Sequence, residues 1–209
     1  MHENVLPQHS LELLDDLGCD PPPPLLGWTL AGGTGLAFRF GHRLSEDLDF
    51  FRTDATDMDA LHRVLATYGE YETLQTDERT LTVLLRKTKL SFFQVRDPFL
   101  FASESYRFFA VAHVVDIALM KLAAIAGRGS RKDFIDLYLI LHDGLTLEDL
   151  FRKLLDKYGA SRINTYHILK SLTYFVDAEK EPVPPMLVPF DWQECKAFFI
   201  REARTIILA

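Results

Sequence analysis

Two glycines and a threonine, Gly32, Gly33 and Thr34, come directly after the apolar residues 25–31. An apolar run of this length that ends at glycines predicts a buried strand followed by a sharp turn. Residues 35–40 then have the pattern of a short helix. Because backbone N–H groups are exposed where a strand turns into a helix, this turn is suited to bind a phosphate group.

The next segment, residues 44–51, alternates between polar and apolar side chains and predicts a strand. Successive side chains of a strand point to opposite faces, so Ser45, Asp47 and Asp49 should share one face. Two carboxylates beside a phosphate-sized turn indicate a site for a divalent metal and a nucleoside triphosphate. Either motif alone is more often a plain turn or a solvated strand face. Their combination in this order makes the interpretation as a site much more specific.

The flanking sequence predicts that this segment lies in a mixed sheet. Residues 5–17 have the pattern of an amphipathic helix, which ends at the four consecutive prolines 21–24. Residues 56–68 predict a second helix. Three segments joined by short turns then predict the strands of an antiparallel meander, at residues 70–76, 80–86 and 89–95.

From about Val111 the pattern becomes helical. Residues 114–126 are apolar on nearly all sides, which predicts a buried helix. Lys121 lies in the middle of it, and a buried ammonium group is costly, so Lys121 should reach water or meet an anion such as a phosphate or an aspartate. A methionine at this position is expected to be tolerated. Asp116 lies in the first turn, where the helix dipole favours an acid, so its role is as readily structural as functional.

A second helix, residues 131–141, carries Asp133 and Asp136, which are three residues apart and therefore lie on roughly one face. In the structural interpretation, Asp133 favours the helix start and Asp136 pairs with Lys132. Further helices are predicted at residues 146–158, 163–178 and 191–207.

The overall composition limits the class of protein. The formal net charge of −7 argues against a protein that coats nucleic acid non-specifically, although it is compatible with a local basic patch. Two distant cysteines, Cys19 and Cys195, and the lack of a signal peptide fit a reducing cytosol, so we expect a cytoplasmic protein with two partly buried thiols. No apolar run approaches the roughly 20 residues of a membrane helix, so no membrane partner is expected.

Four stretches together resemble the AbiEii / MenT family of nucleotidyltransferase-like toxins, which belongs to the polymerase-beta-type nucleotidyltransferase superfamily. They are Gly32-Gly33-Thr34, residues 42–51 (HRLSEDLDFF), residues 116–126 (DIALMKLAAIA) and residues 131–138 (RKDFIDLY). The resemblance runs from about residue 25 to about residue 185. It implies an α+β fold, with a nucleotidyltransferase core lobe at residues 1–112 that carries a small mixed sheet. A helical lobe at residues 113–209 would present its acids to the same cleft.

The resemblance also implies roles for individual residues. Asp47 and Asp49 would hold Mg²⁺, which bridges the phosphates of the triphosphate. Lys121 would neutralise charge that develops on the triphosphate, and Asp133 or Asp136 would be a catalytic acid. The nucleotide-binding residues implied in this way are Gly32, Gly33, Thr34, Arg43, Ser45 and Lys121.

The implied reaction is the attack of a substrate hydroxyl on the α-phosphate of a nucleoside triphosphate, with release of pyrophosphate. The resemblance implies that the acceptor is the 3′ end of a tRNA. It also implies that the protein is the toxin of a bacterial toxin–antitoxin (abortive infection) system, with a DNA-binding antitoxin encoded nearby. Two alternatives keep part of this chemistry: a nucleotidyltransferase that acts on a small molecule or a protein, and a nucleotide-binding module without catalysis.

One departure from the superfamily pattern bears on these alternatives. The superfamily carries a third acid on a strand after the Asp-x-Asp strand, whereas the corresponding segment here, residues 89–95, has no acid. The candidate positions hold Ser91, Phe93 or Gln94, and Lys89 either faces the nucleotide or is a solvated strand end. This departure argues against a complete site with three carboxylates and two metal ions, unless Asp133 or Asp136 supplies the missing carboxylate from the helical lobe.

Overall fold

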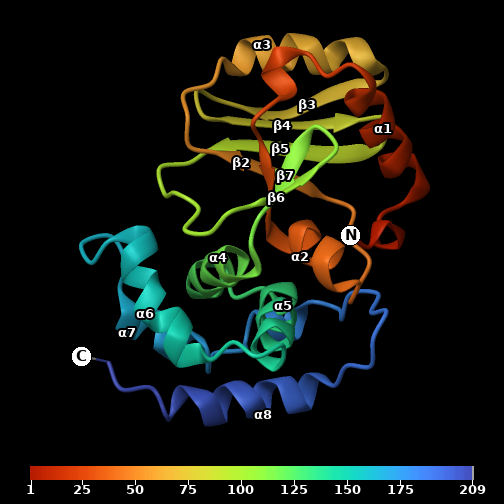
Figure 1. The fold of residues 1–209 in the computed structure, drawn as a ribbon. Helices are drawn as coiled ribbons and strands as arrows, with labels where there is room; N and C mark the ends of the chain where they lie inside the picture. The colour runs from red at the N-terminus through yellow and green to blue at the C-terminus, as the bar shows by residue number, and fades with distance from the viewer. Residues whose placement is uncertain (209) are drawn as a thin grey trace. The chain divides into compact units, whose positions relative to one another are not determined.

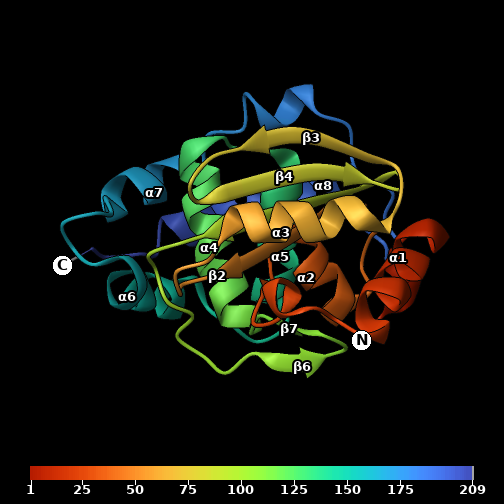
Figure 2. The same cartoon turned by 90° about the horizontal axis from the view of Figure 1, so that it is seen from above.

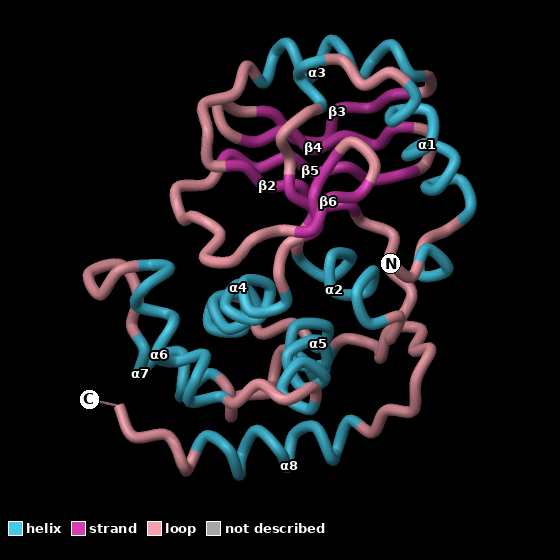
Figure 3. The backbone as a smooth tube through the Cα atoms, in the orientation of Figure 1, coloured by secondary structure: helices cyan, strands magenta, loops and turns pink. Residues whose placement is uncertain are grey.

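The computed structural model describes residues 1–208 of the chain. It divides between His113 and Val114 into two compact units. Within the described residues, every strand lies in the first unit, and the second consists of helices and loops (Figure 3). The predicted α+β fold is confirmed.

The N-terminal unit is built on one seven-stranded mixed sheet (Figure 1). Its strands are β1 (Thr29–Leu30), β2 (Leu48–Arg52), β3 (Tyr71–Thr76), β4 (Thr80–Leu85), β5 (Thr88–Gln94), β6 (Glu104–Tyr106) and β7 (Phe109–Val111). Their order is β3-β4-β5-β2-β1-β7-β6, with β2/β5 and β1/β7 parallel and the other pairs antiparallel. The predicted meander is confirmed as β3-β4-β5. The sequence pattern does not predict β6 and β7, because three residues are too few to show a period of two.

The turn between β4 and β5 sets the register of these two strands. It consists of Arg86 and Lys87, whose φ angles are 49° and 69°. Two residues with positive φ match the two-residue hairpin turn that fits the twist of the flanking strands. The turn pairs Leu85 with Thr88 and, further along the strands, Thr82 with Ser91.

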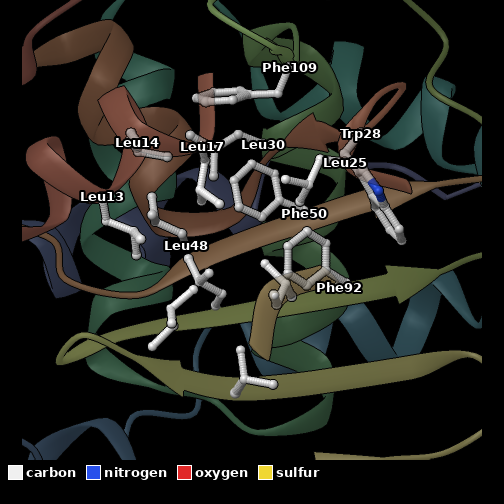
Figure 4. Close-up of a cluster of buried hydrophobic side chains, with 14 of the residues drawn as sticks. Leu13, Leu14, Leu17, Leu25, Trp28, Leu30, Leu48, Phe50, Phe92 and Phe109 are labelled. Carbon is white, nitrogen blue, oxygen red and sulfur yellow. The ribbon is translucent and has the colours of Figure 1, made fainter. Parts of the chain in front are cut away.

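The hydrophobic core of this unit covers one face of the sheet. Helix α1 (Gln8–Cys19) contributes Leu13, Leu14 and Leu17 to it, and α3 (Met58–Leu65) lies across the sheet in Figure 2. Figure 4 shows Phe50 of β2 and Phe92 of β5 stacked, with ring centroids 5.1 Å apart. Since strand side chains alternate between faces, the neighbours of these two rings, such as Asp49, point to the opposite face.

The C-terminal unit is a group of five helices within the described residues: α4 (Val114–Gly127), α5 (Arg131–His142), α6 (Leu147–Tyr158), α7 (Thr165–Ser171) and α8 (Trp192–Ala203). Helix α4 packs against α5, α6 and α7, and α5 packs against α8. The ring of Phe134 on α5 contacts the rings of Trp192 and Phe199 on α8. Thr146 and Asp191 accept backbone N–H groups as N-caps of α6 and α8, which explains where these helices begin.

Several predicted boundaries are wrong. Helix α2 (Gly32–Phe40) begins at Gly32, so the glycines form its first turn instead of preceding it. Strand β1 has only two residues, because Pro23–Leu25 form a 3-10 turn and Gly27 has a φ of 81°. Helix α1 begins at Gln8, directly after Pro7, and α7 ends at Ser171.

Two expectations from composition can be compared with the structure. No helix in residues 1–208 is both long enough and apolar enough to cross a membrane. Both cysteines are free thiols, but Cys19 is exposed, so the expectation that both are partly buried is wrong for it. Burial raises the pKa of the Cys195 thiol well above its ordinary range.

Candidate active site

The first turn of α2 offers uncapped backbone N–H groups next to an acid. Ala31 is the N-cap of this helix and has no side chain that could accept from them. These N–H groups and the positive end of the helix dipole favour an anion at this end of α2. Gly32 has a φ of 63°, which other L-residues rarely adopt, so the first turn requires glycine there.

Asp49 lies on β2, and Asp47 lies in irregular backbone before it. Strand β2 begins only at Leu48, so the predicted strand from residue 44 is wrong at its start. Ser45, Asp47 and Asp49 therefore do not share one strand face. The Ala31 N–H donates to the Asp49 carbonyl over 3.0 Å, which fixes the acid-bearing strand against the start of α2. The Asp47 side chain is 52% exposed, and Asp49 is half-buried.

We call residues 45–49 the acidic segment, and Thr34 and Ser45 hold it against α2. The hydroxyl oxygens of Thr34 and Ser45 are 2.7 Å apart, and the Thr34 hydroxyl also donates to the Asp47 carbonyl. The Ser45 N–H donates to the Val5 carbonyl over 2.9 Å. Both hydroxyl side chains are buried, so their observed contacts position Asp47. A direct contact of Thr34 or Ser45 with a phosphate stays a prediction.

Arg43, which the sequence predicts to bind the nucleotide, is buried. Its guanidinium Nη1 donates to the Leu44 carbonyl over 3.1 Å and to Ser45 Oγ over 3.4 Å. These contacts add to the hydrogen bonds that shape the acidic segment. Binding of the nucleotide by Arg43 stays a prediction.

Strand β5 runs parallel to β2 and places Ser91 directly opposite Asp49. Among the three candidate positions for a third acid, Ser91 is thus the one that is paired with Asp49, whereas Phe93 and Gln94 are paired with Phe51 and Arg52. Lys89, two residues earlier on β5, has its Nζ 3.6 Å from Asp47 Oδ2. Residues 1–208 contain no group of three or more acidic, histidine or cysteine side chains arranged to hold a metal ion.

The two carboxylates of the acidic segment fit a metal that is bound together with a substrate. Carboxylate oxygens suit Mg²⁺, which commonly uses one or two carboxylates together with substrate phosphates and water. A Cβ added at Gly32 would lie 3.2 Å from Asp49 Oδ2, and glycine leaves this space to a ligand. The donor set therefore fits Mg²⁺ that arrives with a triphosphate better than a metal ion held by protein alone.

The C-terminal unit contains an ion cluster, which we define as Lys121, Arg128, Asp133 and Asp136; its members are buried except for the exposed Arg128. Lys121 Nζ lies 2.8 Å from Asp133 Oδ1 and 2.6 Å from Asp136 Oδ2. Arg128 donates to both oxygens of Asp133, over 2.8 Å and 3.0 Å. Lys121 thus meets aspartates, one of the two kinds of anion that the sequence allows. The interpretation in which Asp136 pairs with Lys132 is not observed, because its measured partner is Lys121.

The contacts of the ion cluster keep Lys121 and Asp133 charged. Burial by itself would lower the pKa of Lys121, but the carboxylates of Asp136 and Asp133 outweigh it and raise the pKa. Burial by itself would raise the pKa of Asp133, but Lys121 and Arg128 outweigh it and lower the pKa. Lys121 and Asp133 are therefore ionised at neutral pH.

Asp116, left open between a structural and a functional role, is fully buried in the C-terminal unit. Lys157 on α6 donates to its Oδ1 over 2.8 Å, and both side chains are buried. This ion pair gives Asp116 a structural role that the sequence does not reveal, since its partner lies on another helix. The contact between Arg128 and Asp133 also does not follow from the sequence pattern, because Arg128 lies in the loop between α4 and α5 and has no helical spacing to indicate its partner.

Comparisons with known proteins place the chain among similar sequences. Residues 20–205 match the family described as nucleotidyl transferase AbiEii toxin, type IV toxin–antitoxin system. An uncharacterized protein of Aquifex aeolicus (strain VF5) is 38% identical over 180 residues, which cover 84% of this chain and 85% of that protein.

Two solved structures share the fold at low sequence identity. The nucleotidyltransferase toxin MenT4 of Mycobacterium tuberculosis H37Rv is 18% identical, with a TM-score of 0.58 over 98% of this chain and 88% of that chain. JHP933 of Helicobacter pylori is 16% identical, with a TM-score of 0.51 over 97% of this chain and 89% of that chain.

Proposed function

Because the chain belongs to the AbiEii family of nucleotidyltransferase toxins, we propose that it transfers a nucleotide from a nucleoside triphosphate to the 3′ end of a tRNA. The observation that carries the proposal is the acidic segment beside the uncapped first turn of α2. This arrangement combines two metal-binding carboxylates with backbone donors for phosphate.

Asp47 and Asp49 would hold Mg²⁺ in this reaction. The bound ion would supply charge stabilisation at the phosphates of the substrate. The first-turn N–H groups of Gly32, Gly33 and Thr34 would bind phosphate oxygens, with Arg43 and Ser45 shaping the acidic segment beneath them. An acceptor hydroxyl would then attack the α-phosphorus, forming a new ester bond and breaking the bond to the bridging oxygen, so that pyrophosphate leaves.

Lys121, Asp133 and Asp136 are proposed to act in the same reaction, as their match to the family pattern suggests. Lys121 would neutralise negative charge that develops on the triphosphate, and one of the two acids would orient it. The ion pairs inside the C-terminal unit support a lysine that stays protonated, because Asp133 and Asp136 both contact its ammonium group.

The biological partner we propose is a DNA-binding antitoxin encoded next to this protein, as the family description of a toxin–antitoxin system suggests. The protein would act in the cytoplasm, where tRNA and triphosphates are both present, and would slow growth, as abortive infection requires. The acceptor is the part of the proposal that rests on the resemblance alone.

The decisive experiment is incubation of the purified protein with each labelled nucleoside triphosphate, Mg²⁺ and a total tRNA pool. Label should appear at the 3′ end of tRNA with one or more nucleotides. Asp49→Asn should abolish it, whereas Asp59→Asn, which changes an exposed acid on α3, should leave it unchanged. Pyrophosphate release with a small molecule or a protein as acceptor, and none with tRNA, would reassign the substrate while keeping the chemistry.

A nucleotide-binding module without turnover is the second candidate function. Ser91 favours it, because a hydroxyl stands opposite Asp49 where the superfamily pattern calls for a carboxylate. The two functions separate in one measurement: the module would bind triphosphate with Mg²⁺ but release no pyrophosphate in the presence of total RNA.

A further inference from the structure

Lys89 brings a partly exposed ammonium group to the candidate site. Its Nζ lies 3.6 Å from Asp47 Oδ2, and the register of β2 and β5 places it on the strand that carries Ser91 opposite Asp49. Lys89 and Ser91 are two residues apart on this strand, so their side chains point to the same face. The side of β5 that faces the acids therefore carries an ammonium group and a hydroxyl, and no carboxylate.

The ion pair between Lys89 and Asp47 is weak enough for Lys89 to change partners. The two side chains are 43% and 52% exposed, and an ion pair that exposed contributes at most about 1 kcal/mol to stability. A lysine head is a compact charge on a flexible stem, so it can change partners without moving the strand. The buried Lys121, in contrast, is fixed by two aspartates. Lys89 therefore contributes little to stability, and its ammonium group can move from one anion to another.

The charge of the site differs between its free and occupied states. Without ligand, the negative charges of Asp47 and Asp49 are opposed by the ammonium group of Lys89 and by the buried guanidinium of Arg43 next to Ser45, so a divalent cation meets a partly neutralised site. A triphosphate that arrives with its metal brings negative oxygens, for which an ammonium group is a strong partner. A lysine that contacts Asp47 in the free state and a phosphate oxygen in the occupied state would couple the binding of metal to the binding of triphosphate.

We infer that Lys89 is an exchange residue: in the free protein its ammonium group occupies Asp47 and keeps divalent cations out, and on binding of the metal–triphosphate it moves to a phosphate oxygen. Metal and nucleotide then bind together. The site therefore does not need a third carboxylate to hold a metal ion before the nucleotide binds. This inference rests on the proposed function, because it assumes that the acidic segment binds a triphosphate.

The test measures two affinities of Lys89→Met. Mn²⁺ binding to the free protein is followed by electron paramagnetic resonance. Binding of the α,β-methylene analogues of ATP, CTP, GTP and UTP, each in turn and with the metal removed by EDTA, is followed by calorimetry. The Mn²⁺ affinity should rise by about tenfold and the metal-free analogue affinity should fall by about tenfold, because the same charge has opposite effects on the two ligands.

Lys87→Met is the matched control. Lys87 is an exposed lysine in the turn that leads into β5, so its replacement removes the same charge from the same region of the chain. It should change either affinity by no more than about twofold. Lys89→Arg should stay close to wild type in both measurements, since it retains the positive charge.

The possible results separate the two proposals. If Lys89→Met and Lys87→Met have the same two affinities, Lys89 is not an exchange residue. The same conclusion follows if Lys89→Met binds Mn²⁺ more tightly but binds the analogues as well as wild type does. Both of these results leave the proposed function intact. Wild-type protein that binds neither Mn²⁺ nor any analogue, separately or together, overturns the proposed function and the exchange with it.

Discussion

The acidic pair of the N-terminal unit, Asp47 and Asp49, is at least partly accessible to solvent. Asp47 is 52% exposed and lies in irregular backbone, and Asp49 is half-buried at the start of a strand. The acidic pair of the C-terminal unit is fully buried on one helix, where Lys121 and Arg128 occupy its oxygens. The same kind of side chain thus has two very different surroundings.

This difference indicates how each pair should respond to substitution. Carboxylates that are at least partly accessible to solvent are expected to contribute less to folding than buried ones, so their loss should mainly reduce activity. Buried carboxylates with bound cations form a balanced set of charges, and removing one member leaves another charge buried without compensation. Perturbed pKa values in a structural ion cluster are therefore weaker support for catalysis than a solvent-accessible acidic pair beside the uncapped first turn of α2.

Replacing Asp47 or Asp49 with alanine should have the largest effect on activity. Loss of metal-held charge stabilisation costs several kcal/mol of the reaction barrier, so nucleotide transfer should fall by about three orders of magnitude. Growth arrest on expression should disappear, and the melting temperature should stay near that of wild type. Single-turnover assays, growth curves and thermal melts measure these outcomes. A folded double variant that is as toxic as the parent would show that the acidic segment is not catalytic.

Lys121→Met should have the largest effect on stability. The sequence alone suggests that methionine is tolerated there, but the structure reverses this expectation, because Asp133 and Asp136 would lose their shared ammonium group. Breaking a buried ion pair costs about 3–5 kcal/mol, which corresponds to a fall in melting temperature of roughly 10 °C for a chain of this size.

Lys132→Met provides the control for that experiment, since it removes an exposed lysine from the same helix, α5. Its melting temperature should stay near that of wild type. If Lys121→Met and Lys132→Met have the same melting temperature, the ion cluster does not stabilise the protein. The contrast between the two acidic pairs would then be wrong.

Acid should destabilise the protein partly through Asp133. Its pKa in the folded state lies below the ordinary value of 3.8, so the folded form binds this proton less readily than the unfolded form does. The resulting stability is complete above the unfolded pKa and is lost as the pH falls through the folded pKa. Denaturant titrations at several pH values between 6 and about 2 should therefore show a steeper loss of the free energy of unfolding in wild type than in Asp133→Asn. Equal slopes would contradict the lowered pKa.

Thr34→Val should have the smallest effect and should separate positioning from direct binding. It removes the hydroxyl that bonds Ser45 and the Asp47 carbonyl, which costs about 1–2 kcal/mol of stability because Ser45 is buried. If Thr34 only positions Asp47, kcat should fall while KM for the triphosphate changes little, and Thr34→Ser should restore activity. A rise in KM alone would show that the Thr34 hydroxyl binds the phosphate directly.

How far the candidate site could be predicted depends on the distance between partners in the chain. Gly32, Thr34, Asp47 and Asp49 lie within one stretch, and their residue types alone suggest a phosphate turn beside two metal-binding acids. The exact contacts do not follow from this stretch. An even alternation of side chains predicts a strand from residue 44, yet hydrogen bonds from Thr34 and to Val5 hold the acidic segment in irregular backbone.

Most helices, the meander and the residue types of the site can be predicted from local patterns, because periodicity, caps and short turns act between neighbours in the chain. The pairing of Ser91 with Asp49, the contact of Lys89 with Asp47 and the sharing of Lys121 by two aspartates are seen only in the folded chain. These contacts join segments that are far apart in sequence. Which segments meet is decided by how the whole sheet and the helices bury their apolar faces, and no local pattern contains that information.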